Sequence, residues 1–389
     1  MKHLGDITKI HGDQIEPVDC ITFGSPCQGL SMAGKRLGFD DDRSVLFLDA
    51  ARIIKEMRTA TNGMYPTFAV WENVPGAFSS NGGEDFRAVL EELARVEQPD
   101  VSIPRPSGRG GRWSKAGAIA GNGWSLAWRQ LDAQYWGVPQ RRKRIALVAD
   151  FGGQRAAKIL FERTSLSGNP SESIKAWEAT PGHSQASHFG CDRTSEKVIY
   201  DARGNGDGRT CPTITGDHEN RITDYTAIAI ERHTFNEQSF SHYKESNECS
   251  TLKAKAGNIG NGSECLVAEK TIRWIVRRLT PVECERLQGY PDGWTDIGEW
   301  VDSKGKKHKY ADSPRYKALG NSIALPQWFW IAQKMKPYLS ENATLGSLFD
   351  GIGGFPLVWQ RAYGKGTARW ASEIEEFPMA VTKRRFGEE

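Results

Sequence analysis

A cysteine on a stiffened turn is the first residue with chemical potential. Cys27 lies in GSPCQGLS (Gly24 to Ser31), directly after the apolar run Val18 to Gly24. Such a run is typical of a buried strand, and Pro26 fixes its own φ and restricts the residue before it. A thiol held on a rigid turn past the carboxyl end of a strand is a candidate nucleophile. A small cysteine that only packs in a core explains the same stretch, so Cys27 alone leaves both interpretations open.

Two further stretches place charged side chains where an apolar run ends or begins. Glu72 lies in WENVPG, where the apolar run ends. A partly desolvated glutamate at a strand end can share a proton with a substrate, although a helix cap or a surface acid has the same pattern. Arg142 and Arg144 lie in QRRKRI. Residues two apart in a strand point to the same side, so we expect both guanidinium groups at one site, with a basic strand edge as the alternative.

A glycine-rich turn follows a third apolar run. FDGIGGF (Phe349 to Phe355) lies between an expected strand and an expected helix, and Glu373 ends the next expected strand. Such a turn lets the backbone approach a ligand beside a helix N-terminus, and a carboxylate after the following strand suits a ribose. A tight turn without a ligand is the alternative.

The composition describes an ordinary globular chain. Its 389 residues are 38% hydrophobic and 25% charged, which favours two lobes of unequal size. A net charge of +3 is too small to indicate a nucleic-acid binder by itself. Basic residues nevertheless gather in three clusters, which suits phosphate contact as well as solvated loops. These clusters are Arg105, Arg109, Arg112 and Lys115; Arg141 to Arg144; and Arg273, Arg277 and Arg278.

The cysteines and the apolar runs indicate the compartment and the absence of a metal site or a membrane span. The chain has seven cysteines, an odd number, and no pair has the spacing of a zinc site. We therefore expect no metal and a reducing compartment. The first residues, MKHLGDITKIHGDQ, carry charges throughout, which excludes a secretion signal, and no apolar run reaches about 18 residues. The sequence predicts a cytoplasmic protein without a membrane span.

Strand and helix patterns alternate over residues 1–150. Apolar residues at helical spacing predict helices over Val45 to Arg58 and Asp85 to Val96, and His3 to Ile7 is a short strand candidate. Strands separated by helices predict an α/β fold with a mostly parallel sheet covered on both faces.

Residues 151–270 have a different character. They are rich in Gly, Ser, Thr, Asn and His, and the segments Cys211 to Glu231 and Cys249 to Glu269 resemble each other. We interpret them as a weak repeat of strand–turn–strand units in a loop-rich, mainly β module. After it, Thr280-Pro281-Val282-Glu283 has the pattern of a helix start, and Leu325 to Leu339 predicts an amphipathic helix.

Taken together, these stretches resemble the cytosine-C5 DNA methyltransferase family. GSPCQGLS is similar to its Pro-Cys catalytic loop, WENV to its Glu-Asn-Val motif and QRRKRI to its Gln-x-Arg-x-Arg motif. RRLTPVECERLQGYPDGW and YKALGNSIALP resemble its two late motifs, and LFDGIGGF and SEI its cofactor motifs. The resemblance covers nearly the whole chain except about residues 98–123 and 151–270.

The resemblance implies a Rossmann-like class I methyltransferase fold with a smaller target-recognition domain. Its parts would be a catalytic part at 1–150, target recognition at 151–275, late-motif helices at 276–340 and a cofactor part at 341–389. The implied activity is methyl transfer from S-adenosylmethionine to C5 of cytosine in a specific double-stranded DNA sequence, as in restriction–modification systems, by a monomer. A tRNA methyltransferase, a non-catalytic DNA-binding relative and, from the glycine turn alone, a nicotinamide-dependent oxidoreductase are the alternatives.

The resemblance also assigns roles to residues. Cys27 would add to C6 of a flipped-out cytosine, Glu72 would contact N3, and Arg144, supported by Arg142, would stabilise O2. Glu373 would hold the ribose hydroxyls and Asp6 the adenine amine. The full cofactor set would be Phe349, Gly351, Ile352, Gly353, Glu373, Ile374, Asp6, Ile7, Pro26, Leu46, Asn321 and Ser322. DNA contacts would come from Gln28, Ser31, Lys35 and Arg36, in a loop that could close over the duplex.

The order of the motifs departs from the family. The family runs from the glycine turn through the acidic strand to Gly-Asp-Ile and then Pro-Cys. Here Gly5 to Ile7 comes first, and the glycine turn and SEI come last. The sequence therefore predicts a circular permutation, with the cofactor pocket assembled from segments far apart in the chain.

Overall fold

A computed structural model describes residues 1–25, 42–106, 111–161 and 279–387, together with short strands between residues 198 and 268. The chain divides into two compact units. The first comprises Met1–Ser187, Thr213–Asn220 and Thr280–Glu389, and the second comprises His188–Pro212 and Arg221–Leu279.

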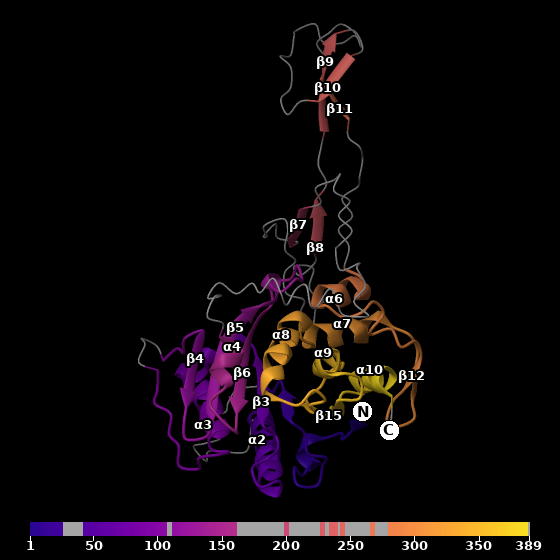
Figure 1. The fold of residues 1–389 in the computed structure, drawn as a ribbon. Helices are drawn as coiled ribbons and strands as arrows, with labels where there is room; N and C mark the ends of the chain where they lie inside the picture. Colours follow the sequence, from indigo (N-terminus) through magenta and orange to yellow (C-terminus); the bar gives the residue numbers. More distant parts are fainter. Residues whose placement is uncertain are drawn as a thin grey trace. The chain divides into compact units, whose positions relative to one another are not determined.

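The first unit is built on an eight-stranded sheet in the order β1-β15-β14-β2-β3-β6-β5-β4 (Figure 1). The first five strands in this order run parallel, and the last three continue the sheet antiparallel. The parallel strands are β1 (Lys2–His3), β15 (Ala368–Ser372), β14 (Leu345–Leu348), β2 (Cys20–Phe23) and β3 (Phe68–Asn73). The antiparallel strands are β6 (Lys143–Asp150), β5 (Ser125–Asp132) and β4 (Ala116–Ala120). The predicted α/β fold with a mostly parallel sheet is confirmed.

Helices cover both faces of this sheet. On one face, α2 (Asp42–Ala60) and α3 (Glu84–Ala94) pack into a core that includes Ile21 and Phe23 of β2. On the other face, α8 (Leu325–Met335) and α9 (Gly354–Tyr363) pack over Thr22 of β2. Alternate residues of one strand thus face two helical layers, which explains why the central strands are apolar without polar alternation. The remaining helices are α4 (Ala156–Leu160), α6 (Pro281–Gln288), α7 (Asp312–Asn321) and α10 (Glu376–Phe386).

Short 3-10 turns and one small hairpin complete the described elements of this unit. The turns are η1 (Ile7–Lys9), η2 (Pro75–Phe78), η3 (Ser80–Gly83), η4 (Ala133–Tyr135) and η7 (Lys336–Tyr338), and the hairpin is β12 (Trp300–Val301) with β13 (Lys307–His308). No described helix is long and apolar enough to cross a membrane.

Two predicted elements are shorter than their patterns suggested. The strand expected over His3 to Ile7 is confined to Lys2–His3, because Gly5 adopts φ +72° and the Asp6 carboxylate accepts the backbone N–H of Thr8 to start η1. The helix expected to reach Leu339 ends at Met335. Pro337 has no N–H to continue the α-helical bonding, and a 3-10 turn follows.

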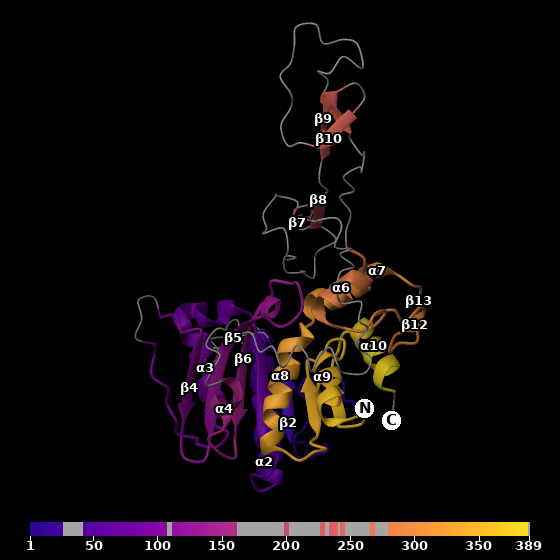
Figure 2. The ribbon, with the colours of Figure 1, turned by 45° about the horizontal axis from the view of Figure 1, so that its top comes forward.

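The two ends of the described chain lie side by side. β1 pairs in parallel with β15, and the backbone N–H of Leu4 donates to the carbonyl of Ala371 over 2.8 Å. Met1 belongs to a small buried cluster against which Phe386 of α10 packs. Figures 1 and 2 both show the N and C labels close together. The sheet is therefore completed by segments from opposite ends of the sequence.

Every described element of the second unit is a strand. β7 (Val198–Asp201) pairs antiparallel with β8 (Thr226–Ala229), and β9 (His233–Ser239) lies between β10 (His242–Glu245) and β11 (Cys265–Ala268). β8 and β11 occupy matching positions in the two similar segments. Each pairs with a strand outside its own segment, and the other residues of both segments lie outside the described residues, so the strand–turn–strand repeat stays a prediction. The proposed domain boundaries stay predictions.

Candidate active site

The carboxyl ends of the five parallel strands form one edge of the sheet. Parallel strands end at the same edge, which is where α/β sheets bind ligands. Gly5 follows β1, the FDGIGGF turn follows β14, Glu373 follows β15, and Ser25 lies two residues after β2. The antiparallel strand β6 begins at this edge, with Arg144 as its second residue. The topology therefore brings together most of the segments that the sequence singled out.

An ion pair between Glu72 and Arg144 lies at this edge. The Arg144 Nε atom is 2.8 Å from Glu72 Oε1, and both side chains are about 14% exposed. Limited solvent access strengthens such a charge-assisted contact relative to one on the surface. A Cβ added at Gly24, the residue after β2, would lie 3.1 Å from Glu72 Oε2. The carboxylate is therefore held between an arginine and the end of the neighbouring strand.

The root of the predicted catalytic loop is fixed by β3. The Asn73 amide donates to the Ser25 carbonyl over 2.6 Å, and the Trp71 indole N–H donates to the Ser25 hydroxyl over 3.2 Å. Ser25 is buried. The strand that carries Glu72 thus anchors the residue before Pro26. Several predicted site residues, Pro26, Cys27, Gln28, Ser31, Lys35 and Arg36, lie outside the described residues.

Arg142 and Arg144 have different partners. The Arg142 guanidinium is buried and donates to the carbonyls of Gly320, at 3.0 Å, and Ser322. Burial lowers its pKa to about 9, and the Arg144 cation adds to this effect, so the group stays charged at neutral pH. Arg142 therefore holds the end of α7 in place, whereas Arg144 contacts Glu72.

The glycine turn contacts the acidic residue that the sequence paired with it. The N–H of Gly351 donates to Glu373 Oε2 over 2.8 Å, and the N–H groups of Ile374 and Glu375 donate to Oε1. Phe349, Gly351 and Gly353 all have positive φ. A Cβ at Gly353 would lie 2.4 Å from the Phe386 ring, whereas one at Gly351 would meet nothing within 4 Å. The turn therefore packs on α10 at one glycine and is open at the other.

The remaining predicted cofactor residues differ in exposure. Ile374 is 66% exposed, and Asn321 at the end of α7 is also exposed. Asp6 is partly exposed, and its pKa is lowered chiefly by the backbone hydrogen bond from Thr8. Of the other predicted cofactor residues, Leu46 is partly buried, and the buried ones are Ile7, Ile352 and Ser322.

The turn after α6 joins the glycine turn to the end of α7. The Trp294 indole N–H donates to the Ile352 carbonyl over 2.8 Å. The Tyr290 hydroxyl forms a hydrogen bond with the Ser322 hydroxyl. A Cβ added at Gly354 would lie 2.5 Å from the Tyr290 hydroxyl oxygen. The motif containing Tyr290 and Trp294 was part of the resemblance, but the sequence did not assign a site role to either residue.

Asp350 is a second residue that sequence reasoning missed. It is buried inside the glycine turn, and burial raises its pKa to about 8, with a smaller contribution from Glu373. The signal that could have identified Asp350 is its place in a glycine-rich turn, because a tight bend does not itself require an acidic residue. Sequence alone does not show that this carboxyl group is enclosed.

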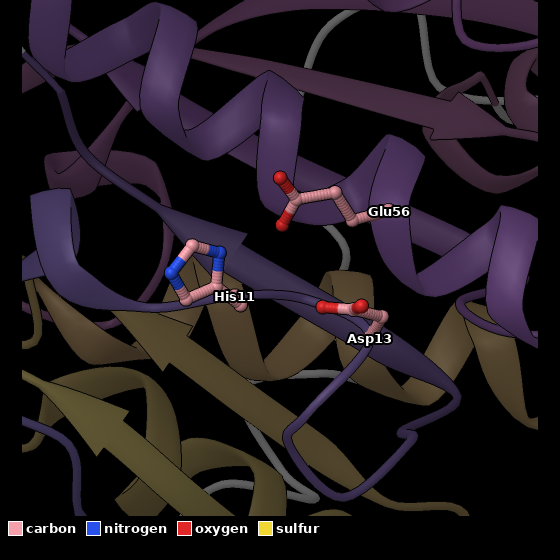
Figure 3. Close-up of side chains that lie close together, drawn as sticks. All are labelled: His11, Asp13 and Glu56. Atoms are coloured by element: carbon pink, nitrogen blue, oxygen red, sulfur yellow. The ribbon is translucent and has the colours of Figure 1, made fainter.

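Two hollows lie away from the glycine turn. One of about 600 Å³ is lined by α2, α3 and Asp13. Near it, His11, Asp13 and Glu56 bring three possible ligand atoms within 4.8 Å of one another (Figure 3). The Glu56 carboxylate already accepts the Gly12 N–H at 2.7 Å and pairs with Arg52. These contacts explain the cluster as an attachment of the N-terminal segment to α2.

The other hollow, of about 380 Å³, is basic. It lies beside the end of β5 and the start of β6, next in sequence to Arg142 and Arg144. The Asp132 carboxylate at its wall accepts hydrogen bonds from Gln134 and from the Arg142 backbone. Cationic side chains from three segments line it, namely Lys115, Arg129, Arg141 and Lys143.

Comparison with known proteins identifies the family. A family model described as C-5 cytosine-specific DNA methylase matches residues 1–97 and 116–337. The chain belongs to this family of DNA cytosine methyltransferases. The predicted family resemblance is therefore confirmed.

Individual relatives match most of the chain, and their names are those of DNA methyltransferases of more than one kind. The DNA N-6-adenine-methyltransferase of Escherichia phage P1 is 30% identical, with 86% of this chain and 55% of that protein covered. The type II methyltransferase M1.ScrFI of Lactococcus lactis subsp. cremoris is 28% identical, with coverage of 87% and 67%. M.HhaI of Haemophilus parahaemolyticus is 25% identical, with coverage of 87% and 83%. The chain thus spans about half the length of the phage protein.

Among solved structures, the S. pombe Dnmt2 methyltransferase is 16% identical to this chain. The comparison covers 86% of this chain and 84% of that chain, with a TM-score of 0.44.

Proposed function

We propose that this protein transfers a methyl group from S-adenosylmethionine to C5 of cytosine in a specific double-stranded DNA sequence. Family membership supports the reaction class. The observation that carries the assignment of residues is the Glu72–Arg144 ion pair beside the anchored Ser25. That pair lies at the same sheet edge as the contact between Gly351 and Glu373.

The residues at the glycine turn suit the cofactor. The turn is open at Gly351, and the buried Asp350 has a carboxyl oxygen without a hydrogen-bond partner among the described residues. Open backbone beside a helix start and a nearby carboxylate are features of nucleoside-binding turns. Glu373 would hold the ribose hydroxyls and Asp6 the adenine amine. When bound, S-adenosylmethionine supplies an electrophilic methyl group on a sulfonium.

The proposed chemistry needs the target base outside the duplex, because C5 and C6 react perpendicular to the ring plane and neighbouring bases cover both faces of a stacked ring. The Cys27 thiolate adds to C6, and electron density moves toward N3 and O2 while C5 becomes nucleophilic. Glu72 hydrogen-bonds N3, and Arg144 stabilises the charge at O2. After methyl transfer to C5, loss of the C5 proton to water re-forms the C5–C6 double bond and expels Cys27 as the thiolate.

Arg142 supports this reaction from a distance. Its guanidinium is buried and donates to the backbone carbonyls of Gly320 and Ser322. We therefore assign it a positioning role, in which it holds the end of α7 near the glycine turn. The sequence had grouped it with the catalytic residues.

DNA is the proposed partner. Residues 151–275 would read the target sequence, and Gln28, Ser31, Lys35 and Arg36 would approach the flipped base from the catalytic loop. The basic hollow beside β6 supports a nearby phosphate contact, since cationic side chains there adjoin the segment that carries Arg144.

Bisulfite sequencing of DNA from cells that express the protein tests the proposal. We expect methylated cytosines within one short sequence, and none in cells that express Cys27→Ser, because serine is a much weaker nucleophile. The purified variant should still bind S-adenosylmethionine in calorimetry. Methylation of adenine N6 or of tRNA would redirect the assignment, and wild-type turnover by Cys27→Ser would refute the mechanism.

A further inference from the structure

Asp350 is an enclosed acid inside the proposed cofactor turn. The Ser347 hydroxyl donates to its Oδ1 atom over 2.6 Å, and its backbone N–H donates to the Ser372 carbonyl over 3.0 Å. The Oδ2 atom is buried and has no hydrogen-bond partner within the described part of the chain. A buried carboxyl oxygen without a partner costs free energy, so a group that binds it in another state of the protein is the expected explanation.

Within the described part of the chain, Asp350 has no cationic partner. Glu373, after β15, acts on it as a like charge. Tyr290, in the turn after α6, is influenced by the Asp350 charge and by the cations Arg142 and Arg361. None of the ion pairs between described residues includes Asp350. The carboxyl group is therefore placed to accept a cation from outside the chain, and it sits next to Gly351, where the turn is open.

We propose that Asp350 is the anionic partner of a positively charged group of S-adenosylmethionine. Two groups of that molecule share this chemistry, the sulfonium and the α-ammonium. The inference rests on the proposed function, because it assumes that the glycine turn binds this cofactor. It adds a binding residue that the motif comparison did not supply.

The proposal predicts how the affinity for the cofactor changes with pH. The pKa of Asp350 in the free protein is raised to about 8, so at neutral pH the carboxyl group is mostly protonated. A bound cation favours the carboxylate and lowers this pKa, so binding releases a proton from Asp350. Affinity for the cofactor should therefore rise with pH and level off above about pH 8. A one-unit fall in pKa corresponds to a gain of about tenfold in affinity across this range.

Calorimetric titration of the purified chain tests the inference without measuring activity. S-adenosylmethionine is titrated from pH 6 to 9 in two buffers of different ionisation enthalpy, and the number of protons exchanged is obtained at each pH. The same titrations are made with Asp350→Asn, which keeps the size and an oxygen for Ser347. The ligand's own amino group titrates in this range, so the difference between wild type and variant isolates the protein carboxyl.

We expect the wild type to release more protons than Asp350→Asn near pH 7, and the variant to lose about tenfold in affinity at pH 9. Titration of S-adenosylhomocysteine separates the two cationic groups. If wild type and Asp350→Asn differ only with S-adenosylmethionine, the sulfonium is the partner of Asp350. If they differ with both ligands, the α-ammonium is the partner. Equal proton exchange in wild type and variant for both ligands would overturn the inference.

Two controls keep the result interpretable. If the wild type does not bind S-adenosylmethionine, the proposed function fails rather than the role of Asp350. Thermal melting from pH 5 to 9 shows that the variant is folded. Because the folded-state pKa is raised, Asp350 destabilises the free protein increasingly as pH rises toward 8, so Asp350→Asn should melt no lower than wild type at pH 8.

Discussion

The ion pair between Glu72 and Arg144 suggests a direct test of the catalytic role of the Glu72 carboxylate. Glu72→Gln keeps the size of the side chain but removes its charge and its capacity to hold a proton for N3. We expect methyl transfer to fall by about 100-fold or more, since positioned acid–base groups contribute on that order, while cofactor affinity changes little. The measurement is single-turnover methyl transfer to DNA containing the target sequence.

Glu84→Gln is the matched control for this residue. Glu84 also pairs with an arginine, Arg87, at 2.9 Å, and its side chain is 18% exposed. It lies at the start of α3 rather than at the carboxyl edge of the sheet. We expect near-normal turnover from Glu84→Gln. Equal losses in the two variants would show that Glu72 acts through stability alone.

At the level of single residues, the sequence indicated the neighbourhood of the site better than its contacts. It placed Glu72 and Glu373 at strand ends, where the structure has them. It predicted that Arg142 and Arg144 point to one side, as residues two apart in a strand do. β6 begins at Lys143, so Arg142 precedes the strand and alternation does not apply to it. The burial of Asp350 depends on tertiary packing, which no local pattern reveals.

At the scale of elements, the turn after α6 joins the glycine turn to the end of α7, and one substitution can test how much it stabilises them. Trp294→Phe removes the N–H that Ile352 accepts in the glycine turn and leaves the ring in place. An unsatisfied buried carbonyl costs about 1–3 kcal/mol, so the free energy of unfolding should fall by that amount. We also expect weaker S-adenosylmethionine binding, measured by calorimetry, because the turn loses its support.

Trp359→Phe provides the comparison at the same scale. The Trp359 indole N–H donates to the Ala343 carbonyl over 2.8 Å, and this tryptophan is also buried. The contact lies before β14, away from the glycine turn. A similar loss of stability with unchanged cofactor affinity is expected. If both variants lose affinity equally, the turn after α6 has no specific role.

Elements were predictable where the signal is local. The start of α6 has the expected capping box, in which Thr280 accepts the Glu283 N–H and the Glu283 carboxylate accepts the Thr280 N–H at 2.7 Å. The pairing of β8 and β11 was not predictable, because strand partners are chosen by long-range contacts rather than by resemblance between segments.

For the whole molecule, the order of the motifs remains the central prediction. The family model matches no residue after 337, although β14 and β15 lie inside the sheet between β1 and β2. We propose that this arrangement is a circular permutation. A chain opened between Ser340 and Glu341, both exposed, with residue 389 joined to Met1 by a short Gly-Ser linker, should fold and bind S-adenosylmethionine within about threefold of the original.

A second rearranged chain, opened between Gly346 and Ser347 within β14, is the control and should not fold. Circular dichroism and thermal melting compare the two designs. Failure of the loop-opened chain as well would show that residues 389 and 1 cannot be joined without distorting the sheet.

The pairing of β1 with β15 also has a consequence for biosynthesis. Residues 2–3 leave the ribosome hundreds of residues before their strand partners at 370–371. Until then the growing chain lacks both strands that join β1 to β2. Contacts so distant in sequence form slowly. The parallel half of the sheet can therefore be completed only after β14 and β15, residues 345–372, have been made.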